Sequence, residues 1–362
     1  MLTGLKDAAE RFVVQRFSEI FAARPFIIYD IGAAGGLFPL LSDRVFPHQR
    51  TYGFEPEPRE YAKLAAVCDA NDRCRVFNLA IANATGSIAF FIHETATHSS
   101  VVRFAETMTQ VEVEAARLDD LGGKLGLPPA DFIKIDIEGG ELAAIASGTD
   151  MLDRHVLGLV TEIGFWRHAE GQTRFSELDS FLTAHGFILF DMTINKSNWS
   201  NIGGKKGKIR SGDALYIRNI KQLYDDSLVN APREEARAQL FKLLLLSYRY
   251  LYVDYALEVA DFGHAVGLIS DDEFTAFARE LATVTDVSRR LPDFPGREMV
   301  SRFLDAASYV VNQALKKDKP VVYSRLGNSQ RLARRQALPG EARISNPAFG
   351  RQQGFKTIKL DR

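Results

Sequence analysis

The stretch from Ile28 to Gly36, Ile-Tyr-Asp-Ile-Gly-Ala-Ala-Gly-Gly, decides the fold of this 362-residue chain. Its apolar residues predict a buried strand, and the small residues from Gly32 onward predict a sharp turn into a helix. Residues without bulky side chains let a ligand approach the backbone at such a turn. Glu55 ends the next predicted strand, 23 residues after Gly32, where an acidic side chain accepts hydrogen bonds from ribose hydroxyls. Together these features predict a nucleoside pocket, against the alternative that the glycines serve tight packing only.

The spacing of the glycines argues against a dinucleotide. A nicotinamide site has the pattern G-x-G-x-x-G, in which the second glycine lets the pyrophosphate approach. Gly32, Gly35 and Gly36 do not match that pattern. Asp30, just before the turn, suits a cofactor with a cationic amino-acid end and no pyrophosphate. An NAD-dependent Rossmann enzyme is therefore the alternative that this turn disfavours.

Strand-like apolar runs alternate with helical patterns from Phe26 to about Asn219. This alternation predicts an α/β fold with a mostly parallel sheet and helices on both faces. The expected strands cover residues 26–31, 51–54, 74–78, 87–92, 132–135, 157–162, and a final pair, 187–192 with 214–218. We expect that pair to form a hairpin across the polar loop 193–213, and loops of this length are usually functional or disordered.

Helix boundaries carry their own signals. Pro58 suits a first helical position, and Gly186 follows an apolar stripe as a C-terminal cap. After Pro232 no strand pattern remains, and Ser270 with Glu273 forms a capping box before another apolar stripe. A Leu-rich helix there carries four tyrosines, at positions 248, 250, 252 and 255. Such a cluster is typical of helix packing or of a dimer face, so we expect a homodimer through this region.

The composition is that of an ordinary globular protein. With 46% hydrophobic residues, 25% charged residues and a net charge of -1, it gives no general signature of nucleic-acid binding. Cys68 and Cys74 are too few for a disulfide framework, so we expect a cytoplasmic protein. No apolar run approaches the roughly 20 residues that span a bilayer, and the charged N-terminal residues do not resemble a signal peptide.

Four parts follow from these patterns. We expect an amphipathic helix over residues 1–24, a nucleoside-binding domain over 25–220 and a helical appendage over 221–315. The tail 316–362 has 12 Lys or Arg residues against 3 Asp or Glu residues. Its composition predicts a disordered, solvated segment, and the alternative is docking to an anionic lipid-linked glycan, membrane surface or RNA.

A second motif lies at the end of the strand 132–135. Phe-Ile-Lys-Ile-Asp-Ile-Glu-Gly-Gly-Glu, from Phe132 to Glu141, places three carboxylates where ligands bind in open α/β sheets. Here the chain resembles the FkbM family of S-adenosylmethionine-dependent methyltransferases. Four family blocks occur in order: D-[VI]-G-A-N-x-G at 30–36, F-E-P-x-P at 54–58, D-F-[IV]-K-I-D-[VI]-E-G-x-E at 131–141 and D-A-L-F-V at 213–217. They span about 190 residues, and Ala34 departs from the family's usual Asn.

The resemblance implies a seven-stranded class I methyltransferase fold, Rossmann-like, over the domain 25–220. It also implies S-adenosylmethionine as cofactor and methylation of a hydroxyl on a sugar, glycan or secondary metabolite. The residues expected to bind the cofactor are Asp30, Gly32, Ala33, Gly36, Glu55 and Pro56. A non-catalytic S-adenosylmethionine-binding module is the other alternative that Ala34 leaves open.

The expected catalytic residues are Asp136, Glu138 and His98. Asp136 is the leading candidate for the general base, because the end of this strand lies beside the transferable methyl group in the class I fold. Glu141 is expected either to belong to the site or to stabilise the first turn of the following helix by its negative charge. Trp166 and His168 follow the strand 157–162, where they suit stacking on a sugar ring or plain packing.

A metal site is the alternative for the carboxylates at this edge. Asp136, Glu138 and Glu162 end neighbouring predicted strands, and hard divalent cations prefer oxygen ligands. We expect methyl transfer without a metal and keep a Mg²⁺ or Ca²⁺ ion as the alternative.

Overall fold

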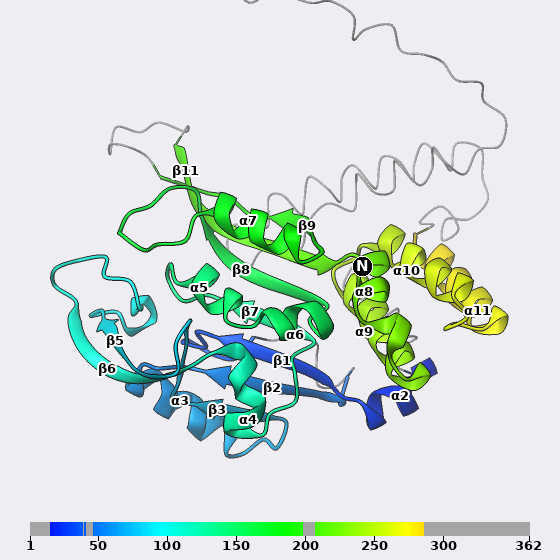
Figure 1. Cartoon of the computed structure of the whole chain (residues 1–362), viewed down its shortest axis with the longest axis horizontal. Coiled ribbons are helices and arrows are strands. Elements are labelled where there is room, and N and C mark those ends of the chain that lie inside the picture. The colour runs from blue at the N-terminus through cyan, green and yellow to red at the C-terminus, as the bar shows by residue number, and fades with distance from the viewer. Residues whose placement is uncertain (1–14, 39, 41–45, 198–206, 286–362) are drawn as a thin grey trace, which may run out of the picture.

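The computed structural model describes residues 15–38, 40, 46–197 and 207–285, which are built around one large sheet (Figure 1). Its strands in spatial order are β10 (Asn195–Ser197), β11 (Lys208–Arg218), β8 (Gly158–Gly164), β7 (Phe132–Ile135), β1 (Phe26–Ile31), β2 (Gln49–Phe54) and β3 (Cys74–Phe77), with β9 (Phe187–Met192) also paired to β11. Five strands, β1, β2, β3, β7 and β8, are parallel, while β11 is antiparallel to β8, β9 and β10. This topology confirms the mostly parallel class I methyltransferase fold and the expected hairpin.

Helices cover both faces of the sheet. All six residues of the central strand β1 are buried, and they alternate between two cores. One core lies under α5 (Glu141–Ala146), α6 (Thr149–Arg154) and α7 (Phe175–Ala184), and the opposite core lies under α2 (Ser18–Ala23), α8 (Ile220–Asp226), α9 (Arg233–Arg249) and α10 (Val253–Ala265). α3 (Pro58–Cys68) packs beside β3, and α4 (Leu121–Leu125) precedes β7. Pro58 opens α3, and Gly186 follows α7 with a positive φ of 77°, as predicted.

A second, smaller sheet stands apart from the first. It consists of β4 (Ala80–Ile81), β6 (Thr109–Ala116) and β5 (Gly86–Ile92), in that order. The strand expected over 87–92 therefore exists, but the expectation that it joins the main sheet was wrong. It pairs antiparallel along its whole length with β6, a strand that the sequence analysis did not predict.

The C-terminal helices share a core with the sheet. Most of α9 is buried against β1, β7, β8 and β11, and α11 (Asp271–Thr285) follows the expected Ser270 and Glu273 capping box. Tyr248, Tyr250 and Tyr255 are buried within this chain, which corresponds to the helix-packing alternative. The remainder of the appendage, residues 286–315, the basic tail 316–362 and most of the N-terminal helix, residues 1–14, lie outside the described residues.

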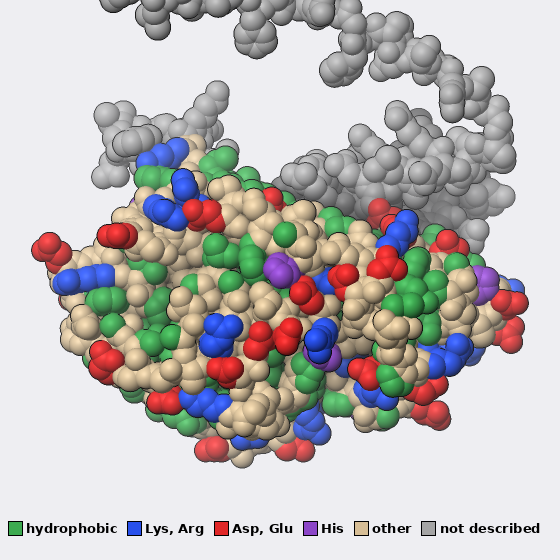
Figure 2. All heavy atoms as spheres, viewed as in Figure 1, with side chains coloured by type: hydrophobic (Ala, Val, Ile, Leu, Met, Phe, Trp, Pro, Cys, Tyr) green, Lys and Arg blue, Asp and Glu red, His purple; other side chains and the backbone are tan. Residues whose placement is uncertain are grey.

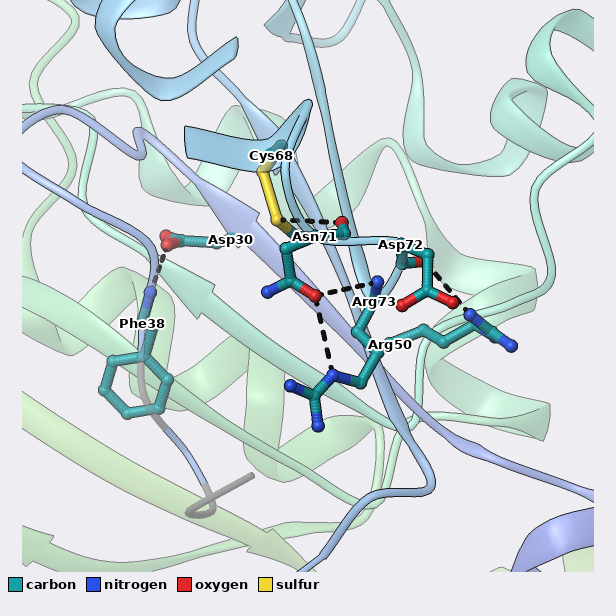
Figure 3. Close-up of a disulfide and its surroundings, with 8 residues drawn as sticks. Asp30, Phe38, Arg50, Cys68, Asn71, Asp72 and Arg73 are labelled. Carbon is teal, nitrogen blue, oxygen red and sulfur yellow. Dashed lines mark hydrogen bonds between the residues drawn. A yellow bond between two sulfur atoms is a disulfide. The ribbon is translucent and has the colours of Figure 1, made fainter. Parts of the chain in front are cut away.

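Cys68 and Cys74 are joined by a disulfide (Figure 3). It links the end of α3 to the start of β3, with the two Cα atoms 5.3 Å apart. The cysteines form a single short link, which is not the multi-bridge framework of a small secreted domain. The pairing itself was not foreseen, because two cysteines six residues apart form a bond only where the fold turns the chain back.

A buried ion pair ties α9 to the sheet. Lys242 Nζ lies 2.7 Å from Asp131 Oδ2, and both side chains are more than nine-tenths buried. The same carboxylate oxygen accepts a hydrogen bond of 2.7 Å from the Ile27 backbone N–H. Asp131 thereby joins the starts of β1 and β7 to the helix above them.

We predict that Lys242→Met lowers the free energy of unfolding by about 3–5 kcal/mol, because it leaves the Asp131 carboxylate buried and unpaired. Urea unfolding measures this loss. The double variant Asp131→Asn with Lys242→Met removes both charges and should recover more than half of it. A single variant within about 1 kcal/mol of the parent protein would contradict the prediction.

Candidate active site

The glycine turn passes directly against the end of β7. Gly32 has a φ of +76°, and a Cβ atom there would lie 1.9 Å from the carbonyl oxygen of Asp136. No side chain fits in that space, so only glycine allows this approach. Gly35 has a φ of +82°, and the Gly36 N–H closes the turn by donating to the Ala33 carbonyl at 3.1 Å. The backbone of the turn therefore lies beside the residues that follow β7.

Asp30 supports this turn from below. It is fully buried, and its carboxylate accepts a 2.7 Å hydrogen bond from the Phe38 N–H (Figure 3). Lys134 Nζ lies 3.3 Å from the same carboxylate and donates to the Gly32 carbonyl at 2.6 Å. Burial raises the pKa of Asp30, and the Lys134 ammonium opposes that shift. Lys134 thus connects the two motifs, and sequence reasoning missed it, although a lysine in an otherwise apolar strand is a visible signal.

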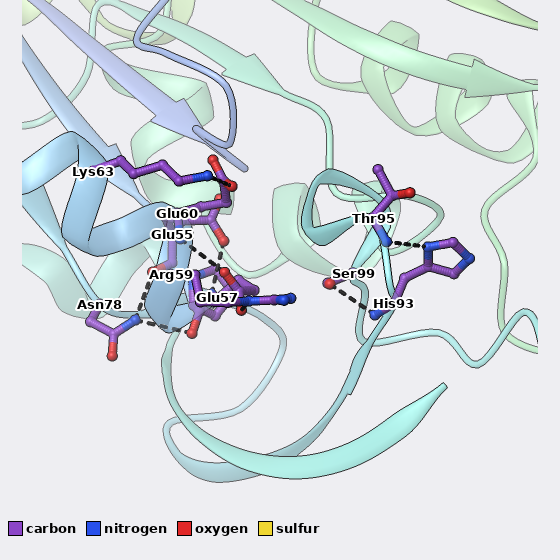
Figure 4. A network of polar contacts seen from close by, with 10 residues as sticks. Glu55, Glu57, Arg59, Glu60, Lys63, Asn78, His93, Thr95 and Ser99 are labelled. Carbon is purple, nitrogen blue, oxygen red and sulfur yellow. Dashed lines mark hydrogen bonds and ion pairs between the residues drawn. The ribbon is translucent and has the colours of Figure 1, made fainter. Parts of the chain in front are cut away.

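Glu55 ends β2 and is held in a fixed orientation. Its carboxylate accepts a 2.8 Å hydrogen bond from the Glu57 N–H, and Asn78 donates to the Glu55 and Pro56 carbonyls (Figure 4). Glu57 in turn caps α3 by accepting from the Glu60 N–H. Burial raises the pKa of Glu55 to about 7. A fixed, largely desolvated carboxylate of this kind is suited to accept hydrogen bonds from hydroxyl groups.

A small pocket lies between Glu55 and Asp136. Its walls are Ile31, Gly32, Ala34, Phe54, Glu55, Pro56, Ala80, Ile81, Phe90, Thr97, Ser99, Val101, Asp136 and Ile137. The small sheet and the segment after β5 therefore supply one wall, which sequence reasoning missed. The pocket therefore has a carboxylate at each end, Glu55 at one and Asp136 at the other.

The expected cofactor residues divide into two groups. Gly32, Glu55 and Pro56 line the pocket. Asp30 and Ala33 are fully buried behind the turn, and Gly36 is exposed on its outer side. Asp30, Ala33 and Gly36 therefore do not line the pocket, whereas Ala34 does. Cofactor contact by the six expected residues stays a prediction.

Three carboxylates gather at the other end of the pocket. Ligand oxygens of Asp136, Glu138 and Glu162 lie within 4.8 Å of one another, and we call these residues the acidic cluster. Glu138 has a φ of +56°, and the Ser100 hydroxyl lies 2.8 Å from its carbonyl oxygen. Burial and the neighbouring carboxylates of Glu138 and Asp136 raise the pKa of Glu162 to about 9. Glu162 therefore carries a proton at neutral pH.

Glu141 does not join the acidic cluster. Its carboxylate accepts hydrogen bonds from the Gly139 N–H at 2.8 Å and the Ile137 N–H at 3.3 Å. The side chain is buried, and burial raises its pKa to about 7. Glu141 shapes the loop that carries Glu138, so its role here is structural.

His98 lies on the short 3₁₀ helix η1 (Ala96–His98), between the pocket residues Thr97 and Ser99. It is exposed, and its ring centre is 5.6 Å from that of His93. Burial and the Asp136 carboxylate raise the pKa of Glu138, and the nearby His98 opposes that shift. Trp166 and His168 follow β8, with their ring centres 4.4 Å apart. His98 therefore lies at the margin of the acidic cluster, whereas Trp166 and His168 lie beyond the end of the strand that carries Glu162.

In the described part of the chain, no helix combines the length and apolarity that a membrane-spanning segment requires.

The chain is similar to known methyltransferases. A model of the methyltransferase FkbM domain matches residues 30–189. The 2-O-methyltransferase NoeI of Sinorhizobium fredii (strain NBRC 101917 / NGR234) is 28% identical over 144 residues, covering 35% of this chain and 59% of that protein. The chain therefore matches less than two thirds of that relative's length.

Two solved structures align at a lower level. Methyltransferase FkbM from Methylobacillus flagellatus KT is 17% identical with a TM-score of 0.33, covering 53% of this chain and 43% of that one. Precorrin-6y C5,15-methyltransferase from Geobacter metallireducens GS-15 is 14% identical with a TM-score of 0.31, covering 56% and 87% of the two chains.

The raised pKa of Glu162 predicts a pH dependence of stability. Between about pH 5 and pH 9 the folded chain keeps a proton that the unfolded chain releases, so the free energy of unfolding falls as pH rises. Glu162→Gln should flatten that fall and raise stability at pH 8 by roughly 1–3 kcal/mol. Urea unfolding from pH 5 to pH 9 measures it, with the exposed Glu112→Gln as the matched control. Equal pH profiles for Glu162→Gln and the parent protein would show that folding does not raise the pKa of Glu162.

Proposed function

We propose that the chain is a methyltransferase of the FkbM type, and that the region matched by the FkbM domain model, residues 30–189, methylates a hydroxyl oxygen of a sugar, glycan or secondary metabolite. One observation carries the proposal. Asp136 lines the pocket and also belongs to the acidic cluster, so the pocket ends where a hydroxyl proton can be accepted. S-adenosylmethionine supplies an activated methyl group on a sulfonium.

The chain's own residues bind and orient the cofactor. Glu55 would accept hydrogen bonds from the ribose hydroxyls, and apolar lining residues such as Phe54 and Ile137 would contact the base. Gly32 keeps the turn against the backbone of Asp136, which sets the distance between the pocket and the acidic cluster. Alignment of the acceptor oxygen with the methyl group is expected to contribute more than proton removal.

Asp136 is the general base in this proposal. Its side chain is 45% exposed and can reach an acceptor, whereas Glu162 already holds a proton at neutral pH and cannot serve as the base. Lys134 Nζ lies 3.9 Å from Asp136 Oδ2. Glu138 shares the acidic cluster, and His98 at the margin is the alternative base. A base of this kind typically adds about 10²- to 10⁴-fold to the rate.

We predict that Asp136→Asn lowers kcat by about 10²-fold or more, because the base is lost while the glycine turn and Glu55 are unchanged. Methyl incorporation from labelled S-adenosylmethionine measures transfer, and calorimetry measures cofactor affinity, which should change less than threefold. Asp225→Asn, an exposed carboxylate on α8, is the matched control. Turnover at the parent rate in Asp136→Asn would remove Asp136 from the role of base.

A divalent cation is the second candidate occupant of the acidic cluster, because its three carboxylates offer the oxygen ligands that Mg²⁺ and Ca²⁺ prefer. The proton on Glu162 already reduces the repulsion among them. We therefore predict that dialysis against EDTA leaves transfer within twofold of the untreated protein. Loss of transfer that added Mg²⁺ restores would assign the cluster to a metal.

Two further proposals concern the cellular location and the oligomeric state of the protein. We propose a cytoplasmic location and a homodimer through the helical region beyond residue 221. The Cys68–Cys74 disulfide does not support that location, because the cytosol keeps most cysteines as thiols. The buried tyrosines do not support that dimer. Oligomeric state and the thiol count of the native protein test these two proposals.

A further inference from the structure

The loop that carries Glu138 into the acidic cluster has a strained backbone. Glu138 has a φ of +56°, and Leu251 is the only other non-glycine residue with a positive φ in the described part of the chain. Residues with a side chain rarely adopt this conformation, and it persists only where the surrounding structure holds it. The contacts of this loop therefore decide where the Glu138 carboxylate lies.

One of these contacts comes from Ser100, which is 38 residues away in the sequence. Its hydroxyl lies 2.8 Å from the Glu138 carbonyl oxygen and 3.0 Å from the Ile137 carbonyl oxygen, so its one proton is donated to this pair. The same hydroxyl oxygen accepts a 2.9 Å hydrogen bond from the Val102 N–H. Ser100 is only 1% exposed, so bulk solvent does not reach it. The hydroxyl thus binds the loop at the strained residue itself.

The small sheet holds Ser100 in turn. The Ser100 N–H donates to the Phe91 carbonyl at 3.0 Å, and the Phe91 N–H donates to the Ser100 carbonyl at 2.8 Å. Phe91 belongs to β5, which pairs along its whole length with β6. Figure 2 shows the atoms of the two sheets as one continuous surface, although a gap separates their ribbons in Figure 1. Ser100 therefore ties the Glu138 loop to the small sheet.

The segment around Ser100 also forms part of the pocket wall. Its neighbours Ser99 and Val101 both line the pocket. Val101 packs closely on the loop after β7, since a Cβ atom on Gly140 would lie 2.8 Å from the Val101 Cγ2 atom. The pocket wall and the acidic cluster are thus connected through consecutive residues of one segment.

Two further contacts hold other groups of the same loop. Glu141 accepts hydrogen bonds from the N–H groups of Gly139 and Ile137, and the Thr173 N–H donates to the Gly139 carbonyl at 2.7 Å. Ser100 instead binds the carbonyls of Ile137 and Glu138. The three contacts act on different backbone groups, so the others cannot replace the Ser100 hydroxyl.

Resting on the proposed methyl transfer, we propose that Ser100 is a positioning residue whose hydroxyl keeps the Glu138 carboxylate in the acidic cluster beside Asp136. Ser100 does not touch the reacting atoms and acts through Glu138. Without the hydroxyl, two carbonyls of a strained loop lose their donor, and the loop relaxes to a different backbone conformation. A displacement of about 1 Å in a catalytic site can lower a rate about 100-fold. Turnover therefore depends on Ser100 more than cofactor binding does.

The test compares the full chain with Ser100→Ala, using labelled S-adenosylmethionine and a cell-extract glycan fraction. We expect Ser100→Ala to lower the rate at saturating glycan about 10- to 100-fold, while cofactor affinity, measured by calorimetry, changes less than about threefold. Ser147→Ala is the matched control, because the buried Ser147 hydroxyl likewise donates to a backbone carbonyl, of Ala144, and accepts from a backbone N–H, of Leu118. Ser147 does not line the pocket, so this variant should keep the parent rate.

A double-mutant cycle with Glu138→Gln separates positioning from a general loss of structure. Both single variants should lower the rate, and adding Ser100→Ala to Glu138→Gln should lower it less than about threefold further, because the two residues act as one unit. Ser100→Cys, whose thiol donates only weakly, takes the place of Ser100→Ala if the alanine variant does not bind the cofactor. Independent losses, or a parent rate in Glu138→Gln, would show that Ser100 does not act through Glu138.

A parent rate in Ser100→Ala would overturn this inference while leaving methyl transfer intact, and so would an equal loss of rate in Ser147→Ala. Absence of incorporation by the parent protein in every extract fraction, with cofactor bound, would instead refute the proposed function on which the inference rests.

Discussion

The close approach of Gly32 to the backbone of Asp136 is the constraint on which the site depends. A side chain at Gly32 would overlap the Asp136 carbonyl, so the turn after β1 and the loop after β7 can lie together only with glycine there. This contact places the end of the pocket at the acidic cluster. Cofactor binding and proton removal are thereby joined through two neighbouring parallel strands, at the sheet edge where α/β proteins bind ligands.

Buried charges hold that arrangement in place. Lys134 lies between Asp30 below the turn and Asp136 at the pocket, and it also binds the Gly32 carbonyl. At the other end of β7, Asp131 and Lys242 join the strand to α9. Charges buried in this way cost desolvation energy, and they are tolerated because each meets an opposite charge or a backbone donor. One short strand therefore carries fixed charge at both of its ends.

The features that could be predicted from the sequence are those encoded by residues close together in the chain. Strand and helix periodicity, the glycine turn and the spacing of Glu55 located the main sheet and its ligand edge. Features that depend on contacts between distant segments were missed. The small sheet pairs β5 with β6, so its partner could not be read from the pattern of residues 87–92 alone. The bond from Lys134 to Gly32 spans 102 residues, and the ion pair of Lys242 with Asp131 spans 111 residues.

The ligand of the pocket distinguishes a methyltransferase from a dinucleotide-dependent enzyme. Isothermal titration of the full chain with S-adenosylhomocysteine and with NAD⁺ tests it, with Glu55→Gln as the variant that removes the ribose contact. We predict saturable binding of S-adenosylhomocysteine, at least tenfold weaker in Glu55→Gln, and no binding of NAD⁺. Binding of NAD⁺ without binding of S-adenosylhomocysteine would contradict the account.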